Sequence, residues 1–438
     1  MRRATRPVLV RSGALLAALL IAAPCWSDSD NPGDAPAPAS APTAGAGSPP
    51  TGLARWFDPA TAPFIPVPEV ATNPNGGTTV GLLPVWLRTD DDHIIRQIIA
   101  PDFLHSPYFG LGFHARMYSY PSQDERWSLL GGAKERVERE FDAEYERGRL
   151  RESRWSFAGS LIYDRDGTPR FYGTGNQSQQ SAQTNFTAEQ SFAQAQIGLN
   201  VSKAWQILYT ARVRFFDVLP GTLSGIPSIE TRFADVGRLG ASHEVLDRLA
   251  VVYDTRDDAT VPDRGVKWVA YAGLDSRGGV LNDSLYSEAG VDGRGFFRIA
   301  RTTILVAHTA LRYLPTLNDA PFWALSSLGG ARSEIGGAQP LRGFGEGRFT
   351  DRNSFSSSVE VRQRAWDFNF ASTHVELEVA PFLDVGRVFP MSTSPFTQLH
   401  KVGGMAFRAI ARPFVVGYVD IGFGSEGPAV FTGIYYPF

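Results

Sequence analysis

The stretch VEREFDAEYER, residues 137–147, alternates between apolar and charged side chains. Its even-numbered positions are all acidic: Glu138, Glu140, Asp142, Glu144 and Glu146. Its odd-numbered positions up to residue 145 are apolar, with Arg139 as the exception: Val137, Phe141, Ala143 and Tyr145. A strand points successive side chains to opposite faces, whereas a helix would scatter these residues around its axis. The stretch therefore predicts a β-strand with one apolar and one acidic face.

The same alternation recurs in about sixteen segments after residue 64. Near residue 380, for example, it separates Leu383 and Val385 from Glu378 and Asp384. Each segment is about 9–14 residues long, which is enough for a tilted transmembrane strand. The segments are centred near residues 82, 113, 130, 142, 159, 194, 210, 250, 270, 292, 308, 360, 380, 406, 419 and 433.

The connections between these segments alternate in length. The long ones cover roughly residues 88–107, 164–186, 217–244, 276–286, 315–353 and 387–400. A soluble sandwich has no reason to place nearly all its long loops at one end, whereas an outer-membrane barrel has short periplasmic turns and long outer loops. The sequence therefore predicts an all-β fold, a sixteen-stranded antiparallel transmembrane β-barrel over residues 64–438. The alternative is a soluble secreted all-β protein.

The N-terminal 63 residues predict export rather than folded structure. Residues 1–27 carry four arginines, an apolar run from about Ala14 to Ala23 and then small residues, as a secretory signal peptide does. A lipoprotein signal that makes Cys25 the first mature residue is the alternative, although Pro24 fits that processing poorly. Residues 28–63 are mostly rich in Pro, Ala, Ser and Gly and predict a disordered linker. We expect a multi-pass β-barrel in the outer membrane of a Gram-negative cell.

Charge and cysteine content exclude several classes of partner. Removing residues 1–27 removes four of the 42 basic residues and none of the 45 acids, which leaves a formal net charge of −7. This balance argues against nucleic acid as a partner. The single cysteine leaves with the signal peptide, so the mature chain has no disulfide and no thiolate metal site.

The last strand segment ends on an aromatic residue. Ile434, Tyr436 and Phe438 share one face of this segment. This ending resembles the C-terminal targeting signal of outer-membrane barrels, which implies recognition by the barrel-assembly machinery. An ordinary edge strand is the alternative.

Residues 339–347 read QPLRGFGEG and lie in a segment poor in strand pattern, from about Pro315 to Asn353. Loops of that length without structure of their own are uncommon and usually functional. The motif PLRGF at 340–344 resembles the loop motif of the BamA/TamA superfamily, also called the bacterial surface antigen family. SFSSSVEVRQRAW at 354–366 and PFLDVGRVF at 381–389 resemble the two strands that follow that loop.

Two further stretches carry the same resemblance. YDTRDDATVPDRG at 253–265 is similar to the family's turn between its eighth and ninth strands, and FYGTGNQS at 171–178 is also similar to members of the family. The likeness covers about residues 64–438. Members usually carry periplasmic POTRA modules before the barrel. Only a linker fits in front of residue 64, so the resemblance is to a barrel-only member.

The resemblance implies that a long sixth outer loop folds back into the lumen. It implies that Arg342, with Gly343 and Phe344, contacts acids on the strand walls. Alternation places Glu360 and Asp384 on lumen faces. A guanidinium presents a planar fork of donors that suits carboxylates. Arg342 is therefore expected to hold the loop in place, and a solvated loop arginine is the alternative.

The resemblance also assigns a periplasmic turn motif made of five residues: Asp254, Arg256, Asp257, Pro262 and Gly265. Asp254, Asp257 and Asp258 are oxygen ligands of the kind that a metal ion prefers. Arg256 among them favours a hydrogen-bonded turn, so we expect no metal and no cofactor.

Enzyme chemistry receives little support from the sequence. There is no G-x-S-x-G elbow, no H-E-x-x-H motif and no phosphate-binding glycine loop. The acids of 138–146 suggest cation selectivity as one interpretation, but a hydrated barrel wall is the favoured one. We expect no enzyme activity.

The family resemblance implies insertion or translocation of polypeptides, or lipid handling, at the outer membrane. It implies a weak seam between the first and last strands, local thinning of the bilayer and regulation by the lumenal loop. The expected partners are outer-membrane lipids, the barrel-assembly machinery during biogenesis and a polypeptide or lipid substrate. The alternative is a passive channel or structural barrel, because a fold alone does not determine function.

Overall fold

The structure is a computed structural model that describes residues 65–89, 95–122, 124–235, 239–259, 261–277, 284–316, 320–370, 373–411, 415–434 and 436. The expected signal peptide, residues 1–27, and linker, residues 28–63, lie outside the described residues, as does Phe438. Within the described ranges, no helix has the length and apolar character needed to cross a membrane.

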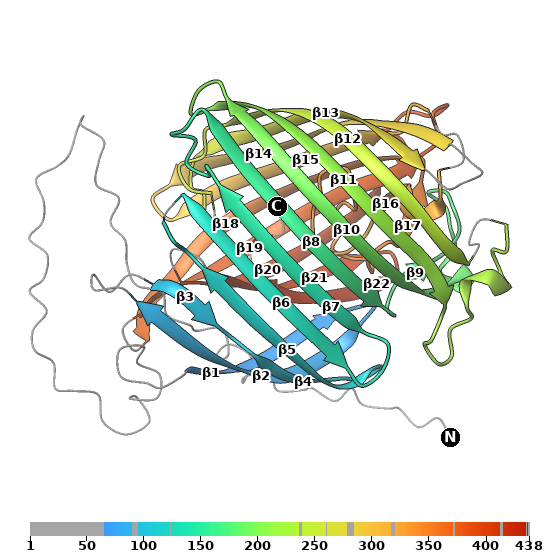
Figure 1. The fold of residues 1–438 in the computed structure, drawn as a ribbon, viewed down its shortest axis with the longest axis horizontal. Helices are drawn as coiled ribbons and strands as arrows, with labels where there is room; N and C mark the ends of the chain where they lie inside the picture. The colour runs from blue at the N-terminus through green and yellow to red at the C-terminus, as the bar shows by residue number, and fades with distance from the viewer. Residues whose placement is uncertain are drawn as a thin grey trace, which may run out of the picture.

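One antiparallel sheet of twenty strands dominates the fold (Figure 1). Successive strands of the sheet pair with one another, with two exceptions. The collinear strands β3 and β4 lie together between β2 and β5, and β8 and β9 both pair with β10. The first half of the sheet contains β1 (Ile65–Asn73), β2 (Gly77–Thr89), β3 (Ile95–Ile99), β4 (Asp102–Ser106), β5 (Gly110–Ser119), β6 (Glu125–Lys134), β7 (Arg139–Arg147), β8 (Trp155–Asp166), β9 (Arg170–Phe171) and β10 (Thr184–Asn200).

The second half continues in the same antiparallel order. It contains β11 (Trp205–Pro220), β12 (Gly240–Asp254), β13 (Gly265–Arg277), β14 (Ser284–Ala300), β15 (Thr303–Tyr313), β18 (Asn353–Phe370), β19 (Thr373–Phe389), β20 (His400–Ala411), β21 (Val415–Gly424) and β22 (Gly427–Ile434). A separate two-stranded sheet, β16 (Ser326–Leu328) with β17 (Phe349–Asp351), lies in the β15–β18 connection. The described residues also form the short 3-10 helices η2 (Gln180–Ala182), η3 (Ile229–Thr231) and η4 (Phe322–Ala324).

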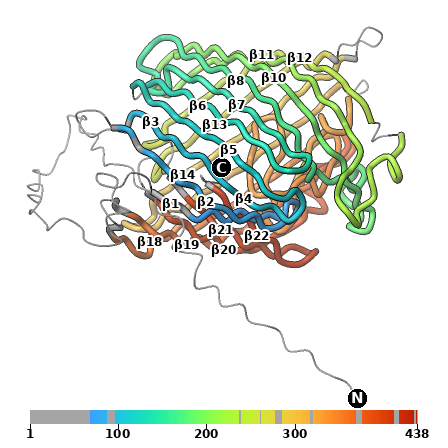
Figure 2. Tube along the Cα trace, turned by 60° about the horizontal axis from the view of Figure 1, so that its bottom comes forward, coloured from blue at the N-terminus to red at the C-terminus, as the bar shows by residue number. Residues whose placement is uncertain are grey.

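The sheet curves round so that its first and last strands meet (Figure 2). The Thr432 hydroxyl of β22 donates to the Val70 carbonyl of β1 at 3.1 Å and accepts from the Thr72 amide at 2.7 Å. No backbone ladder joins β1 to β22 in the part of the chain that the structure describes. This junction therefore differs from the continuous ladders elsewhere in the wall.

The expected alternation of faces is present along the wall. In β15 every second residue is buried, and these residues face the interior. In β7 the apolar Phe141 and Tyr145 lie on the outer surface, 43% and 39% exposed. Exposed tryptophans Trp155, Trp205 and Trp268 stand near the strand ends opposite the longest connections. Aromatic residues at that height are typical of the girdle where a barrel meets the membrane interface.

The sheet contains four strands beyond the expected sixteen: β1, β3, β4 and the two-residue β9 within the expected long loop 164–186. Residues 65–73 form β1, in which Pro66 and Pro68 interrupt the usual strand composition. Residues 95–106, expected to be part of a long loop, form β3 and β4, and the break at Ala100 and Pro101 hides their alternation. All sixteen expected segments do form strands.

Candidate functional site

The described part of the connection between β15 and β18 packs against the inner face of the sheet around residues 328–349. Leu341 and Phe344 are buried in one apolar cluster with Ala380 and Phe382 of β19 and Val402 of β20. Burial of two large apolar side chains stabilises this position by several kcal/mol in total, at about 1.5–3 kcal/mol each. The tip of the loop, PLRGF, is thereby held against the wall formed by β18–β21.

Arg342 occupies the centre of this contact and is 0% exposed. Its Nε and Nη2 donate to the two oxygens of Asp384 at 2.9 and 2.7 Å, which is a bidentate pair. Its Nη1 donates to Glu360 Oε1 at 2.5 Å and to Asp420 Oδ2 at 3.1 Å. Its guanidinium also stacks 3.6 Å from the centre of the Phe382 ring. One loop residue thus joins strands β18, β19 and β21.

The carboxylates that receive Arg342 are shared with arginines of the wall. Arg408 donates to Glu360 at 3.0 Å and to Glu378 at 3.1 Å, and Arg362 donates to Glu360 Oε2 at 2.9 Å. Because opposite charges alternate in this cluster, each buried charge has partners that offset its loss of hydration. Burial alone would lower the pKa of Arg342, but Asp384, Glu360 and Asp420 hold it well above its ordinary value.

Glycines allow the loop tip to approach the wall this closely. A Cβ on Gly343 would lie 2.7 Å from both the Gly424 amide nitrogen and a methyl carbon of Val402. On the facing strand, a Cβ on Gly422 would overlap the carbonyl oxygen of Arg342. Both positions need the absence of a side chain, as expected for a close approach of two backbones.

The turn between β12 and β13 forms a compact hydrogen-bonded unit. Arg256 donates to both oxygens of Asp254 at 3.0 and 2.9 Å. Asp257 Oδ1 accepts from the backbone amides of Asp263 and Arg264 at 2.9 and 3.1 Å. Pro262 is buried, and Gly265 has φ +99°, a conformation that favours glycine.

The same turn contacts the wall through Asp263, whose carboxylate pairs with Arg298 of β14 and Arg364 of β18. No group of three metal-ligating side chains occurs among the described residues. The aspartates of the turn thus bond to backbone amides and arginines.

Comparisons with known proteins agree with this arrangement. The model of the Omp85 superfamily domain matches residues 127–405, which is more than half of the chain. This chain belongs to the Omp85 superfamily. No sequence among the curated proteins matches it.

Solved structures show the likeness of fold. BamA from Haemophilus ducreyi lacking POTRA domains 1–3 has a TM-score of 0.52 at 12% identity, over 81% of this chain and 75% of that chain. CdiB from Acinetobacter baumannii has a TM-score of 0.42 at 11% identity, over 84% of this chain and 58% of its own. CdiB from Escherichia coli has a TM-score of 0.44 at 11% identity, over 84% and 61%. The chain is an outer-membrane β-barrel protein of the BamA/TamA type.

In this Omp85 protein, the β15–β18 connection is held to the wall at a second point that the sequence pattern did not indicate. Arg348 donates to both carboxylate oxygens of Glu426, in the β21–β22 turn, at 2.6–3.0 Å. It also donates to the hydroxyl and carbonyl oxygens of Ser178 at 2.9 and 2.8 Å. Ser178 ends the stretch FYGTGNQS, so that this stretch and the last strand pair meet at one loop arginine.

Asp420 and Arg408 of the buried cluster were also missed. Asp420 is the single charge of β21, VVGYVDIGFG, and Arg408 is the single charge of the stretch MAFRAIA within β20. A charge at an interior position of a membrane strand is a signal in itself. The sequence did not reveal that Glu360 would be shared between three arginines, because that depends on the register of β18 to β20.

Of the C-terminal aromatic residues, the structure describes Tyr436. Its ring lies inside the Omp85 barrel, 3.8 Å from the Arg362 guanidinium and 5.0 Å from that of Arg408. Its hydroxyl donates to Glu378 Oε2 at 3.4 Å. The attraction between an aromatic face and two arginines explains the inward position. The side chain of Ile434 and all of Phe438 lie outside the described residues.

A serine, a histidine and an aspartate also meet in the lumen. His308 Nε2 lies 2.9 Å from Asp292 Oδ2 and 3.4 Å from the Ser333 hydroxyl, which itself donates to Asp292 at 3.2 Å. In a catalytic triad, the aspartate and serine bond to opposite nitrogens of the ring. Here both face the same nitrogen. The three residues therefore attach loop residue Ser333 to β14 and β15 and do not form a proton relay.

The acidic face of β7 lines the interior and is paired in part. Glu146 pairs with Arg126 at 2.8 Å, and Glu140 lies 3.3 Å from His114 Nε2. Glu138 pairs with Lys134. These contacts agree with a hydrated wall carrying partly neutralised charge.

Proposed function

We propose that this Omp85 protein inserts or translocates polypeptides at the outer membrane, with the β15–β18 loop as a plug that regulates the lumen. Omp85 proteins are insertion and translocation factors without enzyme activity. The observation that carries the regulatory part is the buried pairing of Arg342 with Asp384, Glu360 and Asp420.

The plug is attached to the wall by several polar contacts, three of which come from its own side chains. Arg342 binds β18, β19 and β21, Arg348 binds the β21–β22 turn, and Ser333 binds β14 and β15. Because each attachment uses polar groups in a lumen that water can enter, an arriving segment can compete for them one by one. We infer a loop that is stable when seated and can be displaced in steps.

The junction of β1 and β22 is the proposed exit toward the bilayer. Thr432 supplies its hydrogen bonds, whereas adjacent strands elsewhere are joined by continuous ladders. Within the described residues, separating β1 from β22 therefore breaks fewer hydrogen bonds than separating the long strand pairs of the wall. In this proposal, separation of the two strands exposes the edges of β1 and β22. A substrate strand then pairs with one of these edges, which acts as a template for strand addition.

An insertion assay tests this function. The purified full-length protein is placed in liposomes, and the folding of an added unfolded outer-membrane barrel is followed by its heat-modifiable mobility. We expect faster client folding than in empty liposomes, and a change in that rate for Arg342→Ala. Arg332→Ala is the matched control, because Arg332 is an exposed arginine of the same loop. An unchanged client rate with correctly folded protein would rule out insertion.

A passive channel is the second candidate. The observation in its favour is a polar cavity of about 200 Å³ on the wall of β6–β10, with Ser128, Glu144, Ser160 and Gln194 in its lining. If the lumen beside the plug is continuous, steady conductance through the wild-type protein would result. Single-channel recording separates the two candidates, because a plugged barrel opens rarely and a pore stays open.

The partners follow from the proposed function. We infer that outer-membrane lipids surround the wall, that the barrel-assembly machinery acts during biogenesis and that a polypeptide or a lipid is the substrate.

A further inference from the structure

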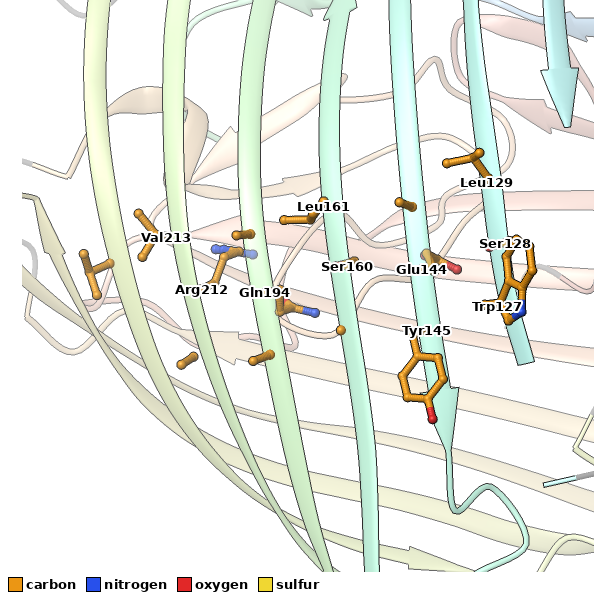
Figure 3. A pocket seen from close by; sticks show the side chains of 16 residues that line it. Trp127, Ser128, Leu129, Glu144, Tyr145, Ser160, Leu161, Gln194, Arg212 and Val213 are labelled. Atoms are coloured by element: carbon orange, nitrogen blue, oxygen red, sulfur yellow. The ribbon is translucent and has the colours of Figure 1, made fainter. Parts of the chain in front are cut away.

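The outer surface of β6–β12 contains a hollow with a volume of about 620 Å³ (Figure 3). Its floor is made of small residues from four adjacent strands: Ala143, Gly159, Ala193, Ala195 and Ala211. The register places Gly159, Ala195 and Ala211 in one row across β8, β10 and β11. In the next row, Ala143 and Ala193 alternate with the larger Leu161 and Val213. The hollow is thus a groove that runs across the strands.

Large side chains border the groove on both sides. The row toward the short turns contains Phe157, Ile197 and Tyr209, which are 47%, 44% and 42% exposed. The row toward the long loops contains Phe141 and Phe215, 43% and 55% exposed. Exposed side chains of this size on an outer-membrane barrel face lipid. The groove is therefore a recess in the lipid-facing surface, open along its length.

The dimensions of the groove match one leaflet of a bilayer. It crosses six strands from β6 to β12, and five strand spacings of about 4.8 Å give about 24 Å. With strands tilted by about 45°, roughly 17 Å of that length lies along the membrane normal, close to half of a hydrocarbon core of about 30 Å. Its Trp127 end lies near the start of β6, on the side of the short turns, and its Val245 end lies midway along β12.

Charged and aromatic groups mark the end near the short turns. Trp127 and Tyr145 close the floor there, and the Tyr145 hydroxyl donates to Glu125 Oε1 at 2.9 Å. Arg147 is exposed and lies directly opposite Glu125 in the β6–β7 register. No ion pair joins Arg147 to a carboxylate in the ranges that the structure describes. Glu125 and Arg147 lie side by side, so their charges are complementary to those of a neighbouring ammonium group and phosphate group.

The far end of the groove is marked by an acid. Asp247 lies on the outer face of β12, beside Ala211 in the register, and accepts a hydrogen bond from the Tyr209 hydroxyl. A carboxylate is an unfavourable neighbour for a methylene chain. Asp247 therefore limits how far an alkyl chain extends along the groove.

We propose that this groove binds one zwitterionic glycerophospholipid of the periplasmic leaflet, phosphatidylethanolamine. One acyl chain lies on the floor of small residues, the ammonium group bonds to Glu125, and the phosphate bonds to Arg147. The binding does not depend on the insertion or translocation activity. It requires only that the wall is embedded in the outer membrane.

Native mass spectrometry of the full-length protein tests the site. The protein is equilibrated in nanodiscs that contain equal amounts of phosphatidylethanolamine and phosphatidylglycerol, then released by gentle activation, and the lipids retained by each molecule are counted. We expect one retained phosphatidylethanolamine, favoured over phosphatidylglycerol by about tenfold. Equal retention of the two lipids would mean that only general membrane contact is present and would overturn the proposal.

Variants separate the groove from the rest of the wall. Ala195→Trp fills the floor and should abolish selective retention, whereas Ala270→Trp, on the outer face of β13 outside the groove, should not. Gly159→Leu is a second filling variant, because a Cβ at Gly159 has its nearest neighbour at 3.6 Å. Arg147→Glu leaves the wall intact and should remove the preference for phosphatidylethanolamine. Unchanged preference in folded Gly159→Leu and Arg147→Glu would contradict the site.

Discussion

At the scale of single residues, the molecule depends on Arg342 and on the carboxylates that surround it. All four of these side chains are buried, and the wall arginines Arg362 and Arg408 offset part of the negative charge that Arg342 alone does not balance. Such a cluster is costly to break, because removal of one member leaves its partners charged and unpaired. It is also specific, because the bidentate pair with Asp384 fixes both the position and the orientation of the loop tip.

Arg342→Ala should lower the free energy of unfolding by up to about 3–5 kcal/mol, the range for breaking a buried pair. Entry of water into the lumen would reduce this loss toward the lower value of about 0–1 kcal/mol for exposed pairs. Arg342→Asp should cost more than Ala, since it adds a fourth carboxylate to the contact. Urea unfolding in lipid vesicles measures the loss, and an Arg342→Ala protein as stable as Arg332→Ala would disprove the buried pairing.

Exchanging the charges of Arg342 and Asp384 gives a separate prediction at this scale. Combining Arg342→Asp with Asp384→Arg should recover part of the loss, because the opposite charges are restored at the same place. Full recovery is not expected, since the exchanged guanidinium does not meet Glu360 and Asp420 in the same geometry. A double-mutant cycle on the free energy of unfolding measures the coupling energy between residues 342 and 384. A double variant no more stable than Arg342→Asp alone would show that the two residues do not act as a pair.

Tyr436 offers a third test. Tyr436→Phe keeps the ring over Arg362 and Arg408 and loses only the long hydrogen bond to Glu378, so assembly should be nearly normal. Tyr436→Ala loses the ring and should reduce the heat-modifiable barrel in outer-membrane fractions. Equal reduction by both substitutions would show that the hydroxyl matters rather than the ring.

At the scale of elements, the β15–β18 loop is the part of the fold that the strand pattern cannot describe. Its tip is held by Arg342 and its end by Arg348, which reaches Glu426 and Ser178. These contacts join the loop to the β8–β10 connection and to the β21–β22 turn. The loop thus ties together segments that are far apart in sequence, and it can be released at either attachment.

Arg348→Ala should free the end of the loop while leaving its tip seated. We expect faster protease cleavage near residue 348 in intact cells, with little change at 339–344. Cleavage within 339–344 at the same rate as in Arg342→Ala would show that the two attachments are one cooperative unit. Arg332→Ala again serves as the control for loss of a loop arginine.

Topology gives another prediction for the elements. A cysteine at Gln180, in η2 of the long β8–β10 connection, should react with an impermeant label on intact cells. A cysteine at Lys203, in the short turn between β10 and β11, should react only after the outer membrane is broken. The reason is that long connections lie outside and short turns lie in the periplasm. The opposite labelling pattern would reverse the orientation of the barrel.

The sequence predicted the strand elements well where one face is mostly apolar, as in β7 and β19. It failed for β1, where Pro66 and Pro68 replace alternating residues, and for β3 and β4, which are short pieces of one bent segment. It indicated Arg342, Glu360 and Asp384 together, because a motif and alternation coincided there. It could not indicate Arg408, Asp420 or Glu426 as their neighbours, since those contacts depend on strand register and on the path of the loop.

At the scale of the whole molecule, three surfaces have different chemistry. The inner face carries charge clusters that seat the loop, and the outer face carries large apolar residues with a small-residue groove between β6 and β12. The junction of β1 and β22 is held through Thr432. An outer-membrane protein with a seated loop and one weakly bonded junction has the parts that regulated opening requires.

Single-channel recording of the purified full-length protein tests the central claim, that the loop is a plug held in place by Arg342. In planar bilayers the wild-type protein should show rare, brief openings, because the seated loop obstructs the lumen. Arg342→Ala should show larger and longer openings, and Arg332→Ala should behave as the wild type does. Identical recordings from the wild-type and Arg342→Ala proteins, both shown to be folded by heat-modifiable mobility, would contradict the account.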